Sequence, residues 1–356
     1  MSVRPRLLVG VLHWGLGHAT RCIPLIEQAE RQGFEVIIAS DGPALALLQQ
    51  HFPQHLCVEL PAYRVRYSRQ GRWMLLYWLW QSAGWWRTYR RERQWLQTWL
   101  LQQPVHGILS DSRPGLFAAH LPCVYLTHQV QPQARWLTPW AQWMHQGWMR
   151  RFTQIWVPDQ PAPRGLSGSL GQGDKPEDKL CYIGPLSRCQ VPPQKHQAWQ
   201  VIAVLSGPEP QRSQLEQQLL KINLQGQTGL LIRGIWNEKK TTWPDPLPNQ
   251  WQVIDFATAA DITGLAEHHP LWISRSGYSS LMDWQVLRQK AILIPTPGQP
   301  EQEYLGKWIQ LQQWLPVVAQ LDLDERLWHL PWERYAGLPP IEKQPNWAER
   351  FTIFRG

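Results

Sequence analysis

Residues 6–40 read RLLVGVLHWGLGHATRCIPLIEQAERQGFEVIIAS, and this stretch decides the fold class. It opens with a short apolar run, 6–12, that leads into a turn containing two glycines. Residues 18–33 then carry apolar side chains at helical spacing and end at a glycine, and residues 34–40 are rich in β-branched side chains. Strand, helix and strand in this order predict a βαβ unit, and therefore a parallel sheet with helices packed on it.

The same alternation continues along the chain in two series separated by a loop. Apolar runs that predict strands occur at 105–112, 121–129 and 154–160, and again at 200–207, 229–234, 251–256, 271–277 and 291–298. Between the series, residues 158–177 are rich in Pro, Gly and Ser, which is typical of a surface loop at a domain junction. A chain of 356 residues exceeds one ordinary hydrophobic core, so two tandem α/β domains are expected. The expected limits are 1–160 for the first domain, 161–188 for a linker, 189–330 for the second domain and 331–356 for a C-terminal tail.

The net charge of +8 lies entirely in the first half of the chain. Residues 1–160 hold 16 Arg, no Lys and 8 Asp and Glu, which implies an anionic partner for this half. Residues 63–101 contain seven of the 24 tryptophans and eight arginines, and residues 135–152 repeat this chemistry. Trp and Arg suit an anionic membrane surface, whereas core-facing helices with solvated arginines explain the same pattern equally well. Nucleic acid is a third interpretation, but no nucleic-acid-binding motif accompanies these residues.

Location in the cell is predicted from the cysteines and the apolar runs. The five cysteines are scattered without metal-ligand spacing, which fits a reducing compartment. The first apolar run is too short for a signal peptide, and no run is long enough to span a bilayer. We therefore expect a cytoplasmic protein that associates peripherally with the inner face of the membrane.

The turn at residues 13–18 is the first candidate site. Gly15 and Gly17 match part of the dinucleotide fingerprint, but Thr20 replaces its third glycine, so binding of NAD is disfavoured. A simpler interpretation is a tight turn in which His18 caps the following helix. Ligands of parallel sheets bind at the carboxyl ends of strands. There the sequence places three groups: His13 to His18, Asp111 to Arg113, and Thr127 to Gln129.

Three stretches of the second half have the features of a phosphate- and sugar-binding site. Ser206 and Gly207 follow a strand and precede a helix, and residues 273–284, ISRSGYSSLMDW, repeat that arrangement with a carboxylate at Asp283. Gln302 and Glu303 follow a third strand. The alternatives are an ordinary turn, a serine-capped helix and a surface turn, respectively.

Taken together, these motifs resemble those of the GT-B glycosyltransferases, and most closely the MurG-like group, which transfers N-acetylglucosamine from UDP to a lipid-linked acceptor. HWGLGH resembles that group's Gly-Gly-x-Gly-Gly-His turn, and VLSGPEPQ stands in place of its Gly-Gly-Ser loop. RSGYSSLMD resembles its Arg-x-Gly-x-x-Thr-x-x-Glu motif. In EQEYLG, Gln302 and Glu303 stand at the position of its Gln-Gln pair. The resemblance covers most of residues 6–310.

The resemblance implies a GT-B fold, in which two tandem Rossmann-like parallel-sheet domains face each other across a cleft. The N-terminal domain would take the acceptor and the C-terminal domain a nucleotide-sugar donor, a UDP-sugar, with no further cofactor and no metal. His18 is then the base or the residue that orients the acceptor, and Asp111 is the competing candidate for the base. The implied donor-binding residues are Ser206, Gly207, Arg275, Ser276, Gly277, Ser279, Ser280, Asp283, Gln302 and Glu303. The implied acceptor-side residues are His13, Gly15, Gly17, Arg113 and His128.

The predicted function is glycosyl transfer, with inversion, from a nucleotide diphosphate sugar to a membrane-associated or lipid-linked acceptor. Arg275 and the following helix start would stabilise the leaving group. Three departures from the family pattern keep alternatives open: Asp283 is shorter than Glu, Glu303 adds a charge, and Glu209 would repel a diphosphate if it pointed inward. A non-catalytic nucleotide-sugar-binding or scaffold protein is one alternative, and a GT-B sugar-nucleotide epimerase is another.

Overall fold

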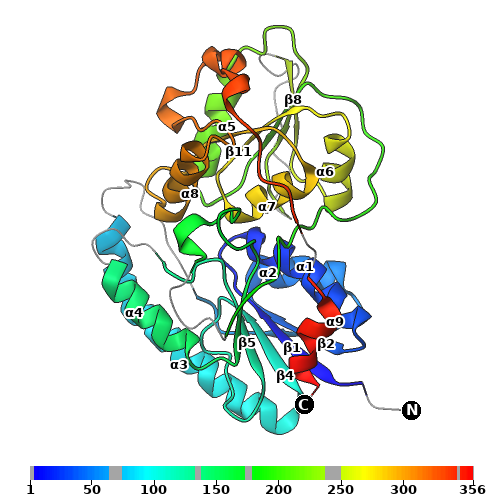
Figure 1. Cartoon of the computed structure of the whole chain (residues 1–356), viewed down its shortest axis with the longest axis vertical. Helices are drawn as coiled ribbons and strands as arrows, with labels where there is room; N and C mark the ends of the chain where they lie inside the picture. The colour runs from blue at the N-terminus through cyan, green and yellow to red at the C-terminus, as the bar shows by residue number, and fades with distance from the viewer. Residues whose placement is uncertain are drawn as a thin grey trace. The chain divides into compact units, whose positions relative to one another are not determined.

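A computed structural model of the chain describes residues 4–63, 74–132, 138–172, 179–236, 250–342 and 345–355, with the side chains of 74–83 and 138–141 left out (Figure 1). The chain forms two compact units. Unit 1 comprises Met1–Arg66, Leu75–Leu186 and Ile341–Gly356, and unit 2 comprises Tyr67–Met74 and Ser187–Pro340. Each unit is built on a parallel sheet of its own.

Unit 1 contains a seven-stranded parallel sheet in the order β3-β2-β1-β4-β5-β6-β7. Its strands are β1 (Arg6–Val11), β2 (Glu35–Ser40), β3 (Leu56–Glu59), β4 (Gly107–Asp111), β5 (Cys123–Leu126), β6 (Gln154–Val157) and β7 (Leu180–Tyr182). The order reverses between β1 and β4. In open α/β sheets this reversal is the point where ligands bind, outside the carboxyl ends of the strands.

Helices cover both faces of this sheet, as expected for an all-parallel sheet (Figure 1). They are α1 (Leu16–Arg31), α2 (Gly42–His51), α3 (Met74–Gln102) and α4 (Thr138–Met149), together with the short α9 (Trp347–Arg350). Leu8, Ile108 and Tyr125 of the strands share one buried core with Leu96 of α3 and Met149 of α4. Because side chains alternate along a strand, the neighbouring Leu7 and Val9, also buried, project to the opposite face.

Unit 2 repeats this design with five parallel strands in the order β10-β9-β8-β11-β12. The strands are β8 (Val201–Val204), β9 (Gly229–Ile232), β10 (Trp251–Ile254), β11 (Leu271–Ser274) and β12 (Ala291–Leu293). The helices are α5 (Gln211–Lys221), α6 (Ala259–Ala266), α7 (Tyr278–Leu287) and α8 (Pro300–Leu311). Here the order reverses between β8 and β11, so the second candidate site is expected at the ends of these strands.

Short 3₁₀ helices complete the described chain: η3 (Gly168–Leu170), η6 (Gln320–Asp322), η7 (Glu325–His329), η8 (Trp332–Arg334) and η9 (Phe351–Phe354). The expected limits of the domains differ from those of the units in two places. The expected linker, 161–188, contains η3 and β7, and β7 is the edge strand of the first sheet. With three residues, this strand is too short to show any period in the sequence. Residues 173–178 of the expected junction loop lie outside the described residues.

The expected tail, 331–356, is divided between the units, because Ile341–Gly356 belongs to unit 1. Phe351 and Phe354 are fully buried there. The ring of Phe351 lies 5.6 Å from that of Phe34 and 5.5 Å from that of Trp156, measured between centroids. The edge of the Phe354 ring occupies the space over Gly107 that a Cβ atom would need. These aromatic contacts make the end of the chain part of the first core.

Candidate active site

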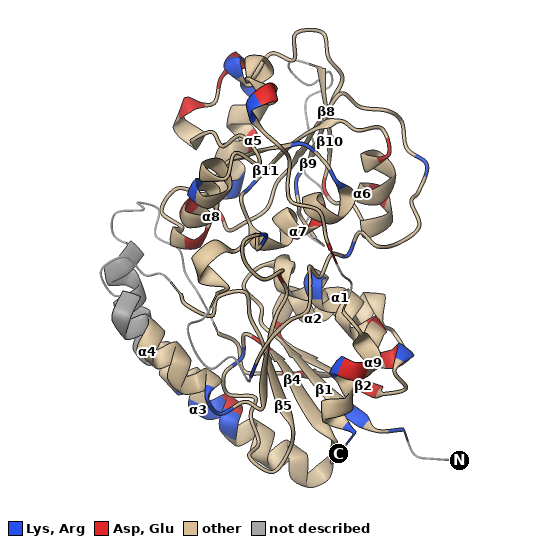
Figure 2. Cartoon of the chain, viewed as in Figure 1, with Lys and Arg blue, Asp and Glu red and all other residues tan. Residues whose placement is uncertain are grey.

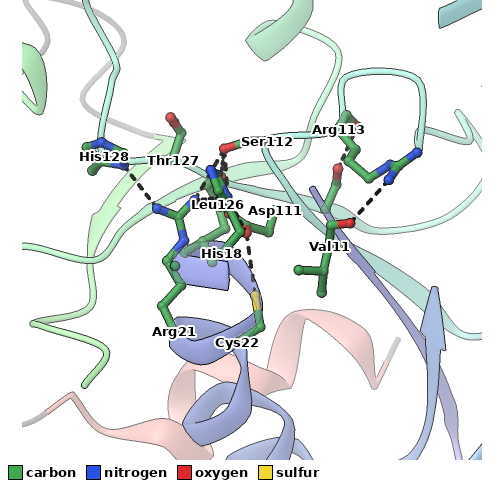
Figure 3. A network of polar contacts seen from close by, with 12 residues as sticks. Val11, His18, Arg21, Cys22, Asp111, Ser112, Arg113, Leu126, Thr127 and His128 are labelled. Atoms are coloured by element: carbon green, nitrogen blue, oxygen red, sulfur yellow. Dashed lines mark hydrogen bonds and ion pairs between the residues drawn. The ribbon is translucent and has the colours of Figure 1, made fainter. Parts of the chain in front are cut away.

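The first candidate site lies where the order of the unit 1 sheet reverses. Val11 at the end of β1 pairs with Asp111 at the end of β4, and α1 begins a few residues after β1. Gly15 precedes the helix with φ +84°, a conformation that favours glycine and lets the chain turn sharply from strand into helix. His18 in the first turn of α1 is thereby brought beside Asp111, from 93 residues away in the sequence (Figure 3).

His18 and Asp111 form a pair in which the carboxylate orients the imidazole. Nδ1 of His18 lies 2.8 Å from Oδ2 of Asp111. Asp111 is completely buried, whereas 15% of the His18 side chain is exposed. No hydrogen-bond partner for the other ring nitrogen, Nε2, is found among the described residues. The sequence presented these two residues as competitors for one role, but the structure brings them together as a pair.

Asp111 is ionised at neutral pH. Burial by itself raises the pKa of this carboxyl, but the positive charge of Arg21 and the contact with His18 outweigh it and bring the pKa to about 2. An ionised carboxylate can only accept hydrogen bonds. Nδ1 of His18 therefore carries the proton and donates a hydrogen bond to Asp111, and the lone pair is left on Nε2.

Arg21 belongs to the same candidate site and was not selected from the sequence. Its Nη2 contacts Oδ1 of Asp111 and lies 2.8 Å from Nδ1 of His18, and its Nη1 lies 3.1 Å from Nδ1 of His128 (Figure 3). Arg21 follows His18 by three residues, so the two share one face of α1. That spacing was the available signal, but it acquires meaning only once Asp111 and His128 are placed.

His18 is neutral at pH 7. Its pKa lies below the usual value because burial disfavours the charged ring and because the Arg21 guanidinium repels a second positive charge. The Asp111 carboxylate acts in the opposite direction without cancelling these effects. A neutral imidazole with an oriented Nδ1 and an available Nε2 is the form that a general base requires.

The other predicted acceptor-side residues have different surroundings. Arg113 points away from the dyad and is fully buried, with Nε 2.6 Å from Glu92 and Nη1 2.7 Å from Asp41 (Figure 3). It therefore ties α3 and the start of α2 to the sheet, and its charge is balanced by these two carboxylates. His13 lies 3.3 Å from the same Asp41, and its ring packs against Gly42.

The second candidate site lies at the carboxyl ends of β8, β11 and β12 in unit 2. Gly207 follows β8 at φ +100° and is exposed. A Cβ atom at Gly207 would lie 3.9 Å from Oγ1 of Thr296, so the loops after β8 and β12 meet here. Thr296 is only 3% exposed, and its hydroxyl has no hydrogen-bond partner in the described part of the chain. A buried hydroxyl without a partner is costly, and its position beside the Gly207 loop makes Thr296 a candidate for a hydrogen bond to a ligand. The sequence analysis did not select Thr296.

The start of α7 belongs to the same region. Gly277 precedes the helix, the half-buried Ser279 and Ser280 lie in its first turn, and a Cβ atom at Gly277 would meet nothing closer than 4.0 Å. Ser206, also half-buried, follows β8, the strand next to β11. The start of a helix is the positive end of its dipole and attracts phosphate. These four predicted donor residues are therefore at least partly accessible beside a helix start.

Gln302 and Glu303 shape the loop after β12. Oε1 of the buried Gln302 accepts a hydrogen bond from the main-chain N–H of Thr296 at 2.9 Å, and its carbonyl accepts one from the Ser276 hydroxyl at 2.8 Å. Oε1 of Glu303 accepts one from the N–H of Gly298 at 2.7 Å. Gln302 thus links the loop after β11 to the loop that holds Thr296.

Arg275, expected to stabilise the leaving group, is directed into the protein. It is fully buried, and its guanidinium donates to Gln320 and to the carbonyl of Gln211, each at 2.8 Å. Burial lowers its pKa to about 10, so it remains charged at neutral pH. Through its hydrogen bonds to Gln320 and to main-chain carbonyls, the guanidinium joins the end of β11 to α5 and to the segment after β12. Sequence alone could not show this direction.

Asp283 is held by the chain that enters unit 2. Its Oδ1 accepts a hydrogen bond from Ser187 at 2.6 Å, and Oδ2 lies 3.6 Å from Nε of Arg188. Burial raises the pKa of this carboxyl, and the nearby Arg188 only partly offsets the effect. Two neighbours therefore already occupy the group expected to bind sugar hydroxyls.

Glu209, expected to repel a diphosphate, is paired. Its carboxylate contacts Arg212 and accepts hydrogen bonds from Ser213. Burial by itself raises the pKa of Glu209, but Ser213 and Arg212 lower it below its usual value. Because Arg212 balances the charge, Glu209 does not exclude an anion from this loop.

Two successive parallel sheets with these strand orders define the GT-B fold, which the sequence predicted. No family model and no curated protein matches the chain. Solved structures do match: the glycosyltransferase of kitacinnamycin covers 99% of this chain and 94% of its own, with a TM-score of 0.65 and 13% identity. The spinosyn rhamnosyltransferase SpnG complexed with thymidine diphosphate covers 88% and 86%, with a TM-score of 0.59 and 13% identity. MurG of Acinetobacter baumannii covers 93% and 91%, with a TM-score of 0.54 and 10% identity. The resemblance to GT-B glycosyltransferases is thus confirmed for the fold.

Proposed function

We propose that the protein is a glycosyltransferase that uses a nucleotide diphosphate sugar and inverts the configuration of the transferred sugar. The observation that carries the proposal is the His18–Asp111 pair at the switch point of the first sheet. The structures similar to this chain include several named as glycosyltransferases, and one of them was solved with thymidine diphosphate. A UDP-sugar remains our proposed donor.

Unit 1 supplies the base. Nε2 of His18 takes the proton of the acceptor hydroxyl while the acceptor oxygen forms its bond to the anomeric carbon. The bond from that carbon to the diphosphate breaks, and its electron pair leaves on the phosphate oxygen. Asp111 stabilises the imidazolium that forms, because its carboxylate stays ionised and bonded to Nδ1.

Unit 2 supplies the donor site. The start of α7, the exposed Gly207 loop and the Thr296 hydroxyl offer dipoles and donors for a diphosphate. This arrangement replaces the contact expected from Arg275 and needs no metal. Because Glu209 and Glu303 have partners of their own, they give no reason to prefer a scaffold protein without activity.

The acceptor is proposed to be membrane-associated, on the basis of α3 and α4. Trp86 is 47% exposed and Trp143 73% exposed, and the exposed Arg87, Arg90 and Arg91 gather on α3 (Figure 2). Indoles and guanidiniums together match an anionic lipid surface. Further along α3, aromatic side chains instead pack onto the core. Residues 64–73 and 133–137 of the two Arg/Trp stretches lie outside the described residues, and in the described part no helix is both long and apolar enough to span a membrane.

Three experiments test the proposal. Thermal shift against UDP-, GDP- and dTDP-sugars should show stabilisation by one donor class, and absence of stabilisation by every nucleotide would refute it. With the donor known, His18→Ala should lose turnover while it retains donor binding, because His18 and the donor site lie in different units. For the acceptor, Arg90→Glu/Arg91→Glu should lower co-sedimentation with anionic but not with neutral vesicles. Equal binding of the unmodified protein to both vesicle types would contradict membrane association.

A further inference from the structure

Arg21 joins three elements of unit 1 around the proposed base. It comes from α1, contacts Asp111 at the end of β4 and lies beside His128, which follows β5. Its Nη2 also lies 3.3 Å from the hydroxyl of Ser112. The guanidinium is therefore committed to the immediate surroundings of His18, and the side chain is buried.

Other buried arginines of the chain have different partners. Arg113 is bonded to two carboxylates and to main-chain carbonyls, and it contacts neither side chain of the dyad. Arg275 is bonded to Gln320 and to main-chain carbonyls. Their partners explain them as residues that hold the fold together. Arg21 instead shares its carboxylate with His18 and approaches two imidazoles.

The geometry at Nδ1 of His18 shows how Arg21 acts on the ring. Nδ1 lies 2.8 Å from Oδ2 of Asp111 and also 2.8 Å from Nη2 of Arg21. A single ring nitrogen cannot donate to the carboxylate and accept from the guanidinium at the same time. The ionised Asp111 accepts the hydrogen bond from Nδ1–H. Arg21 therefore acts on the ring through its positive charge and through the carboxylate that it holds in place.

We propose that Arg21 is a positioning residue: it locks Asp111 against His18 and keeps a permanent positive charge beside the imidazole, so that the ring stays neutral until it accepts a proton. His128 fixes the other end of the guanidinium, with its Nδ1 as the acceptor at 3.1 Å. This role rests on the proposed function, in which His18 is the base. In this role His128, which the sequence analysis expected on the acceptor side, contacts Arg21 and supports the base indirectly.

The charged and titratable groups that face His18 agree with this role. They are Asp111 from β4, Arg21 and the thiol of Cys22 from α1, and His128 from the segment after β5. Cys22 is uncharged, because burial raises its pKa well above the usual value. Arg21 is therefore the fixed cation that opposes protonation of His18, and Asp111 is the anion that favours it.

The test measures the ring directly, by NMR titration of His18 in the full chain without substrate. Arg21→Met should raise the pKa of His18 by about one unit, the lower end of the effect of a charge within ~4–6 Å. Arg21→Lys keeps the charge and should leave the pKa near its original value. The matched control is Arg31→Met on the same helix, because Arg31 is mostly exposed and pairs with Glu27. An unchanged pKa in Arg21→Met, or an equal rise in Arg21→Lys, would overturn the proposal.

Activity gives the second readout. The acidic limb of the pH profile of kcat/KM should move upward by about one pH unit in Arg21→Met and stay in place in Arg21→Lys. In Arg21→Lys kcat should still fall severalfold, because an ammonium cannot bridge Asp111 and His128 as the fork of a guanidinium does. If kcat falls in both variants without any movement of the limb, Arg21 is merely structural. If His18→Ala keeps its turnover, the proposed function fails, and the NMR result stands separately from that failure. Arg21→Gln serves as the neutral variant where Arg21→Met does not fold.

Discussion

Replacement of Asp111 by Asn is the most informative single change, because it keeps the shape of the side chain and removes its charge. The hydrogen bond from His18 to the carboxylate is 2.8 Å long and charge-assisted. Such bonds contribute roughly 1.5–3 kcal/mol. If this energy is expressed in the transition state, where the imidazolium forms, kcat falls by about 10- to 150-fold, at 1.36 kcal/mol per factor of ten.

The same change should also destabilise the fold. Asp111→Asn would leave the buried Arg21 without its anionic partner, and removal of one member of a buried ion pair typically costs about 3–5 kcal/mol. The assay therefore measures kcat per folded molecule, by release of nucleoside diphosphate, and pairs it with urea unfolding. The KM for the donor should not change, because the proposed donor site lies in unit 2.

Asp159→Asn provides the matched control. Asp159 is a buried carboxylate of unit 1 that accepts hydrogen bonds from the N–H groups of Gln160, Leu166 and Ser167, and none of these bonds involves His18, Arg21 or Asp111. Its replacement should change stability but leave kcat per folded molecule unaltered. The reasoning is refuted if Asp111→Asn is folded and turns over within about threefold of the unmodified protein, since the bond would then contribute under ~0.7 kcal/mol.

Three further predictions concern acid stability, the donor site and metals. The folded-state pKa of Asp111, about 2, lies below its unfolded value of about 3.9. This group therefore contributes about 2–3 kcal/mol of stability above pH ~4 that is lost as the pH falls towards 2. Urea unfolding across this range should show a shallower loss in Asp111→Asn, and an equal loss would contradict the assignment. Thr296→Val removes a buried hydroxyl without a partner, so stability should not fall, whereas the dissociation constant for the donor nucleotide should rise about three- to tenfold. Unchanged affinity in a titration would exclude this hydroxyl from the donor site. Activity should persist in EDTA, because the proposed donor site relies on a helix start and hydroxyl donors to hold the diphosphate. Loss of activity that added Mg²⁺ restores would count against it.

The fold was predictable because its determinants are local. Each βαβ unit is marked by a change of period from two to 3.6 residues, and glycines mark several of the turns. Strand order is a different matter, because β1 and β4 pair across about a hundred residues that include α3. The sequence placed His18 and Asp111 at strand ends but could not show that those strands are neighbours, and it therefore left the two residues as rivals.

The direction of a side chain was the second limit. Arg113 and Arg275 stand next to strand ends, where an exposed charge and a buried one look the same in sequence. The structure buries both, because main-chain carbonyls and carboxylates or amides inside each unit accept hydrogen bonds from their terminal guanidinium nitrogens. Nε of Arg275 has no partner among the described residues. Thr296 was missed for the converse reason. A threonine among prolines carries no pattern, and only its burial without a partner marks it.

Residues 341–356 have a consequence for how unit 1 can be made. Phe351 and Phe354 complete an aromatic cluster with Phe34 and Trp156, although more than 150 residues of unit 2 are synthesised in between. On the ribosome, this side of unit 1 stays uncovered until the end of the chain emerges. Unit 1 therefore begins to be synthesised first, but its core is completed only after all of unit 2 has been made. A chain cut after Leu186 would expose that cluster to water. Dissection of the protein into halves should instead graft 341–356 onto the first unit through a short linker.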